Sequence, residues 1–190
     1  MAYTKVSIPK KTGGPGTPEA KEPNVIFILV KDLLKVDGAI TGFPDRDSNG
    51  VLSTSDLALA VGAEAVGVYC TPSTINRFDS SEGDVDKAGF IQNFSGEHPG
   101  DELAFAEWLQ NNVNEDFLII SKECSSSAGT RLHGTPCNPM KLEVSGQDNN
   151  EGKMSTLTFK SIQRSSKKMM HYVGALPTLA ADYASGYGGL

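Results

Sequence analysis

Apolar and polar positions form their clearest pattern in HPGDELAFAEWLQNNVNEDFLII, residues 98–120. Three large apolar residues recur at helical spacing and predict one buried helix face: Phe105, Trp108 and Leu109. Two acids stand before them, where the free amides of a first helical turn favour negative charge. The asparagines that follow are poor helix formers and end the pattern. We therefore expect one helix at about 101–112 and a short strand at 117–120.

Elsewhere the apolar positions alternate or form short runs, which is typical of strands. Expected strands lie in the first half of 24–36 and at 63–71, 88–94, 141–145, 154–162 and 169–173. The second half of 24–36 fits either a strand or a helical turn. The pair 141–145 and 154–162 predicts a β-hairpin. The polar stretches 73–89 and 121–140 are expected to be loops. The predicted fold is mainly β (α+β): a two-sheet antiparallel β-sandwich or barrel with one flanking helix and extended terminal arms.

The two ends of the sequence differ from its middle. Residues 1–23 are rich in Lys, Pro and Gly, and such a segment buries too little apolar surface to fold alone. It is predicted to be a flexible N-terminal arm, either disordered or ordered against a neighbour. Residues 24–177 form the predicted domain, and the small, Gly-rich segment 178–190 forms a C-terminal arm.

Charge and composition narrow the function classes. The formal net charge of -6 gives no general attraction to DNA or to an anionic membrane. The longest apolar run, VIFILV at 25–30, is too short to span a bilayer, and no apolar signal segment precedes it. Three widely spaced cysteines favour reduced thiols and synthesis inside the cell.

A calcium-loop pattern occupies DRDSNGVLSTSD, residues 45–56. Four oxygen-bearing side chains stand at positions 1, 3, 5 and 12 of the loop: Asp45, Asp47, Asn49 and Asp56. Gly50 at position 6 permits the sharp turn, and a helix is expected at 56–61. The same residue types also build an ordinary polar turn, and the twelfth position carries the shorter Asp in place of Glu. Ca²⁺ is the one cofactor that the sequence suggests.

No catalytic motif stands out, so we expect no enzyme. A phosphate-binding loop and a GxSxG elbow are both absent. His133, Cys137 and Cys124 fall short of the two close ligand pairs that a structural zinc site uses. His98 and His171 are expected to be surface or turn residues. Acids dominate 79–102, which predicts either a solvated loop or an acidic functional surface.

The order of elements carries one resemblance, over residues 24–177. The acidic segment EGDVDKAGF (82–90) is followed by a strand, by HPGDELAFAEWLQNN (98–112) and by FLIIS (117–121). After these come LHGTPCNPMKLEV (132–144), STLTFKS (155–161) and YVGALP (172–177). This layout resembles bacteriophage major tail tube proteins and their relatives in contractile injection machines. The resemblance implies a β-sandwich or barrel with one helix. It also implies long loops and arms that join copies into rings, commonly hexameric, which stack into a hollow tube.

The resemblance implies a structural virion protein of the tail, made in the cytoplasm of a host bacterium. Its implied partners are copies of itself and the tape measure, tail terminator and baseplate proteins, with DNA only as passing cargo and no membrane. An acidic bore would repel DNA phosphates. Candidates for the lumen or for an inter-ring loop are Glu82, Asp84, Asp86 and Asp148. Two alternatives stay open: another virion part, such as a tail terminator or head decoration protein, and a calcium-dependent binding module that uses loop 45–56.

Overall fold

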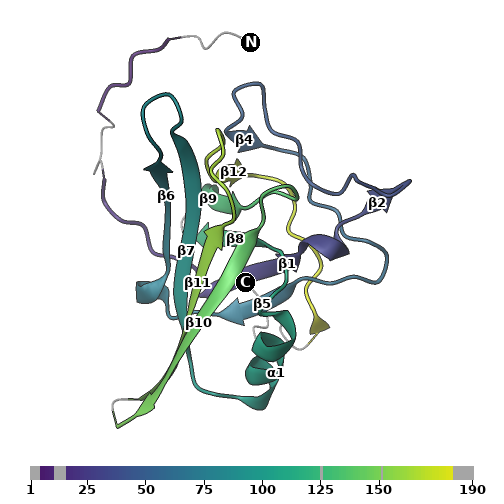
Figure 1. Cartoon of the computed structure of the whole chain (residues 1–190), viewed down its shortest axis with the longest axis vertical. Coiled ribbons are helices and arrows are strands. Elements are labelled where there is room, and N and C mark those ends of the chain that lie inside the picture. Colours follow the sequence, from purple (N-terminus) through teal and green to yellow (C-terminus); the bar gives the residue numbers. More distant parts are fainter. Residues whose placement is uncertain (1–4, 11–15, 125, 151, 182–190) are drawn as a thin grey trace.

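A computed structural model describes residues 5–10, 16–124, 126–150 and 152–181 (Figure 1). This part of the chain is mainly β, with one α-helix, α1 (Leu103–Asn112). The long strands are β1 (Asn24–Leu29), β6 (Asn76–Glu82), β7 (Gly89–Pro99), β8 (Phe117–Glu123), β9 (Ser126–His133), β10 (Met140–Asn149) and β11 (Gly152–Ser161). The short ones are β2 (Lys35–Val36), β3 (Ala39–Ile40), β4 (Leu52–Ser53), β5 (Val66–Tyr69) and β12 (Met170–Tyr172).

Ten strands form one sheet in the order β4-β12-β9-β8-β10-β11-β7-β6, and β1 pairs with β8 and β5 off this path. All of these pairs are antiparallel except β4 with β12. The strands β8 and β10 meet through a single pair, Phe117 with Met140. Because β4 and β6 end the path without pairing each other, the described strands form no closed barrel, and that expectation is wrong.

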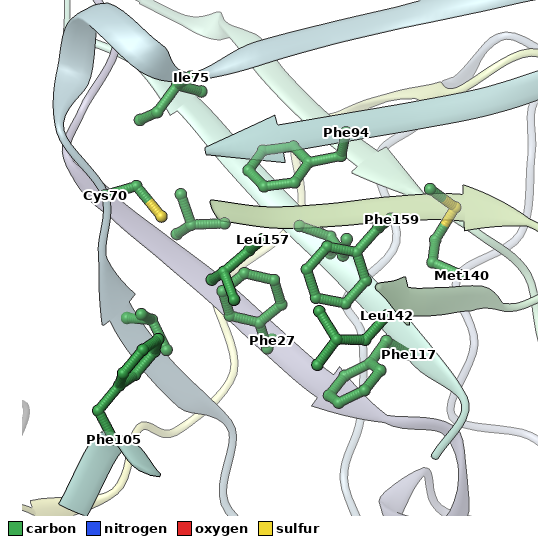
Figure 2. Packing of buried hydrophobic residues seen from close by; sticks show 13 residues of the cluster. Phe27, Cys70, Ile75, Phe94, Phe105, Phe117, Met140, Leu142, Leu157 and Phe159 are labelled. Atoms are coloured by element: carbon green, nitrogen blue, oxygen red, sulfur yellow. The ribbon is translucent and has the colours of Figure 1, made fainter. Parts of the chain in front are cut away.

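The main core is built largely from residues of β1, β7, β8, β10 and β11. The Phe27 ring stands at its centre, 5.0 Å from Phe159, 6.2 Å from Phe94 and 6.2 Å from Phe117, measured between ring centroids. All four rings are buried, and Figure 2 shows them packed with Leu142 and Leu157. Edge-to-face pairs of this kind add to the free energy of apolar burial.

A second apolar cluster covers the opposite face of β1 and β8. Ile26 and Ile28 of β1 and Leu118 and Ile120 of β8 pack there against the Tyr172 ring and residues of the loops. Both strands are therefore buried on both faces, which explains why their sequences are unbroken apolar runs. The Tyr172 hydroxyl lies 3.0 Å from the Leu57 amide, whose hydrogen bond it accepts, so this large side chain has no unsatisfied polar atom.

The predicted helix is confirmed as α1, with Phe105 buried and with Trp108 and Leu109 packed against the main core. The predicted hairpin is confirmed as β10–β11, which is longer than expected at its tip. Among the described residues, no helix has both the length and the apolar character that a bilayer crossing needs.

Two expected loops are strands. β6 lies within 73–89, and β9 lies within 121–140. Neither has an apolar alternation, because β6 turns Arg77 and Asp79 inward and β9 is largely Ser, Ala, Gly and Thr. Their pairing with β7 and β8 is specified by backbone hydrogen bonds across the sheet, which the local sequence does not reveal.

The predicted arms fall partly outside the described residues, and those bounds stay a prediction. Residues 5–10 and 16–20 are exposed. Just after them the chain pairs with the end of β8, where the Cys124 and Glu22 amides bond to the carbonyls of Ala20 and Lys122. In the other arm, residues 178–180 pair with Ala65, and 182–190 lie outside the description.

Candidate functional site

The strands β6, β7, β11 and β10 present a polar face on the side opposite the core. The register sets Asn76, Ser95, Thr158 and Glu143 side by side across all four strands. The next row is Phe78, Asn93, Lys160 and Lys141. Inward residues one position away, such as Phe94 and Leu157, are buried. This half of the sheet thus has one dry face and one face that can meet water or a charged polymer.

The β6–β7 turn carries three of the four predicted acidic residues. The Glu82 carboxylate lies 3.5 Å from the Lys160 ammonium, and both groups are half exposed. Asp84 and Asp86 are exposed, and Asp86 has a φ of 65°, in the left-handed region that Asp tolerates in turns. Because the Glu82 pair is exposed, it stabilises the fold little and leaves the turn available for contacts.

The β10–β11 tip carries the fourth acidic residue, Asp148, whose carboxylate lies 3.1 Å from the Lys153 ammonium. The strand β10 is exposed from Glu143 to its end. The ladder pairs Glu82 with Gly89 at one end of β7 and Met154 with Pro99 at the other. Eleven residues of β7 separate the two turns, about 33 Å at 3.3 Å per residue. Figure 1 shows the turns at opposite ends of the molecule, so the four acids form two sites.

In the large sheet, the strands β4, β5 and β6 each pair on one side only among the described residues. A free edge exposes unpaired amides and carbonyls that can pair with another extended segment. The longest of the three is β6, with seven residues.

An interior ion pair joins β6 to β8 and β9, which sequence reasoning missed. The Arg77 guanidinium donates to the Ser121 carbonyl at 3.1 Å, to the Gly129 carbonyl at 2.8 Å and to the Glu123 carboxylate. Its side chain is buried, and burial lowers the pKa of Arg77 from its usual value. Because these oxygen atoms accept hydrogen bonds from the guanidinium, the buried charge of Arg77 links β6 to β8 and β9.

His133 lies close to this pair and is fully buried against the Phe94 ring. Neither of its ring nitrogens has a hydrogen-bond partner. Burial, with the positive charges of Arg77 and Arg131, lowers the pKa of His133 to about 3. The side chain is therefore neutral at pH 7. Cys124 and Cys137 are exposed, and no three His, Cys, Asp or Glu side chains in the described ranges are grouped as metal ligands.

Loop 45–56 is held together by its own hydrogen bonds. The Asp47 Oδ1 accepts the amides of Leu52 at 3.0 Å and Val51 at 2.8 Å, which lowers the pKa of Asp47. The Asp56 Oδ1 accepts the Ala175 amide at 2.7 Å. The Arg46 guanidinium donates to the Gly50 carbonyl at 2.8 Å.

The helix that was expected after this loop is wrong, because residues 56–61 are irregular. A single bridge there pairs Leu59 with Leu33. Calcium binding by Asp45, Asp47, Asn49 and Asp56 stays a prediction. Calorimetric titration with Ca²⁺ would release or absorb heat if the loop binds the ion. Asp47→Ala would abolish that heat, and a flat titration of the unaltered chain would leave the loop a structural turn.

Comparison of the chain with protein-family models, curated proteins and solved structures found no match.

Proposed function

We propose that this chain is the tube subunit of a phage tail, which assembles into stacked, commonly hexameric rings that enclose a channel for DNA. The observation that carries the proposal is the β10–β11 hairpin. It projects beyond the body of the molecule in Figure 1, and its tip is exposed on both strands. A long exposed hairpin loses conformational entropy without burying apolar surface, so contact with another subunit is a reason to keep it.

In this proposal the strands form two packed layers, a β-sandwich. We assign β5, β1, β8, β9, β12 and β4 to one layer and β10, β11, β7 and β6 to the other. The single pair between Phe117 and Met140 joins the layers, and the Phe27 cluster fills the space between them. In this arrangement the polar face of the second layer is turned to solvent, where a channel wall would lie.

Free edges and opposed turns support closure and stacking. Head-to-tail contacts between different surfaces form a ring when the rotation closes. The free edges of β5 and β6 are different surfaces of this kind. The acidic β6–β7 turn and the β10–β11 tip lie at opposite ends of β7, so one ring would meet the next through unlike ends.

In the proposed tube, Glu82, Asp84, Asp86 and Asp148 line the channel mouth or the contact between rings. Negative charge there would keep DNA phosphates from binding as the genome passes. The exposed Lys160 and Lys141 on the same layer balance part of this charge. The proposal assigns no catalytic residue. Its partners are copies of the chain and the proteins at the two ends of a tail.

Negative-stain microscopy of the purified chain tests the proposal. Tubes or stacked rings are the expected result. Single rings that never stack would favour the tail terminator, and monomers at high concentration would refute assembly altogether. Any affinity tag is cleaved off before imaging, so that both terminal arms are free to pair.

A further inference from the structure

The unpaired edge of β6 combines main-chain groups with an apolar side chain. β6 pairs with β7 from Asn76 to Glu82, and in the described ranges no main-chain hydrogen bond joins it to another element. Since an antiparallel pair uses alternate residues, the amides and carbonyls of the other residues point to the open side. Phe78 stands exposed on the outer face of this strand. Such an edge is completed by an extended segment with apolar side chains at alternate positions.

The apolar surface continues inward from Phe78. Phe78 lies opposite Asn93 in the ladder, so Ile91, two residues away, is its diagonal neighbour on the outer face. Ile91 and Ile162 line one groove beside it, and Ile162 is exposed. The outer face therefore has an apolar patch next to the edge, and a strand added there would bury part of this patch.

Residues 5–10, KVSIPK, have the side-chain pattern that this edge requires. Val6 and Ile8 are 65% and 87% exposed, and in an extended chain they point to the same side. Pro9 favours an extended backbone at Ile8, and proline is tolerated in a strand at the edge of a sheet. Figure 1 shows this segment away from the strands, so it does not cover the β6 edge of its own chain.

The segment and the edge also carry opposite charges. Residues 5–10 contain Lys5 and Lys10 and no acid. At the end of β6, the turn to β7 contains three acids and one base: Glu82, Asp84, Asp86 and Lys87. Because the lysines stand at the two ends of the segment, either strand direction brings one of them toward this turn. The attraction favours this partner and weakens as salt is added.

We propose that residues 5–10 of a second copy pair with the unpaired edge of β6 and place Val6 and Ile8 against Phe78. This inference rests on the proposed self-assembly and names one of its contacts. The segment of one copy and the edge of the next are different surfaces, so the contact can repeat around a ring. It uses β6 for a contact between subunits and leaves the unpaired side of β5 available.

Cross-linking between two full-length chains tests the contact. Cys124→Ser and Cys137→Ser first remove the exposed thiols from both chains. An Ile8→Cys chain is then mixed with a ¹⁵N-labelled Phe78→Cys chain and treated with a short bismaleimide, which bridges the roughly 5–8 Å between facing positions on a sheet. Mass spectrometry should find a product with one chain of each kind. Ser7→Cys is the matched control and should give several-fold less product, because its side chain points to the other side of the segment.

A chain that carries both Ile8→Cys and Phe78→Cys separates the two possible sources of the segment. The proposal expects links between chains whose yield rises with protein concentration and falls in 1 M salt. A link within single monomers would assign the segment to its own chain and overturn the proposal, as would equal yields from Ile8→Cys and Ser7→Cys. Microscopy of the same samples tests the tube separately. Tubes without the mixed product would overturn this contact alone, whereas the mixed product without tubes or rings would support the contact and refute the tube.

Discussion

The two halves of the sheet differ in what surrounds them. β1 and β8 are buried on both faces, between the Phe27 cluster and the Tyr172 cluster. The strands β6, β7, β10 and β11 are buried on one face only, and two of their turns extend into solvent. The first half therefore has no solvent-facing side on which its residues can vary, whereas the second half can vary its outer surface without loss of the core.

The largest expected effect comes from the centre of the buried half. Phe27→Ala removes a ring that touches three other phenylalanines, and we expect a loss of about 3–5 kcal/mol in the free energy of unfolding. Phe78→Ala is the matched control on the polar half, where the ring is 45% exposed. Urea unfolding of both variants compares them, and equal losses would contradict the division between the halves.

Arg77→Met tests the ion pair that joins the halves. It leaves the Glu123 carboxylate, which is largely buried, without its main partner, so we expect a loss of about 3 kcal/mol. The exposed pair of Lys31 with Glu115 is the comparison, and Lys31→Met should cost about 0–1 kcal/mol. Both costs are read from chemical unfolding, and a similar cost at both pairs would show that Arg77 is not a structural tie.

His133 predicts a dependence of stability on pH. Unfolded histidine takes up its proton near its ordinary pKa of about 6.5, whereas in the fold the pKa is about 3. Between these values the unfolded chain binds more protons, so stability is complete above that window and falls as the pH drops through it. The slope from this group reaches roughly 1 kcal/mol per pH unit.

Unfolding curves of the unaltered chain and of His133→Phe measure this contribution. The two chains should differ in stability by an amount that changes between pH 6.5 and 3 and stays constant above that range. A constant difference at every pH would show that His133 has the same pKa in the folded and unfolded chains, and would contradict its burial as a neutral side chain.

Removal of the acidic charges should have the smallest effect on the fold. Replacing Glu82, Asp84 and Asp86 with their amides should change the free energy of unfolding by about 0.5 kcal/mol or less, because these side chains are exposed. If the turn contacts a neighbouring ring, the same variant should alter the salt dependence of assembly, measured by light scattering. Unfolding of the variant at low denaturant would show that the turn supports the fold.

How far the sequence predicts the structure depends on burial. The helix with Phe105 and Trp108 and the strand that begins at Phe117 are predicted, because apolar spacing reports which side chains are buried. β6 is missed because its inward residues are Arg77 and Asp79, whose burial depends on partners distant in sequence: Glu123 for Arg77 and the Met169 amide for Asp79.

The candidate site is less predictable still. From the sequence, Glu82 and Asp148 are equivalent acidic candidates. Only the strand pairing shows that they lie toward opposite ends of β7. His98 is predicted to be exposed and is buried, because the fold brings Phe105 and the Tyr69 carbonyl to it. Both outcomes come from contacts between segments far apart in the chain.

The central claim is that the exposed half exists to join subunits, and shortening its longest projection tests that claim most directly. Replacement of 147–154 with Asn-Gly closes the β10–β11 hairpin directly after the pair of Gly146 with Ser155 and leaves every core residue in place. The proposal expects stacks from the unaltered chain, and negative-stain microscopy of the shortened chain should then find folded single chains or single rings. Stacks of equal length from both chains would contradict the account.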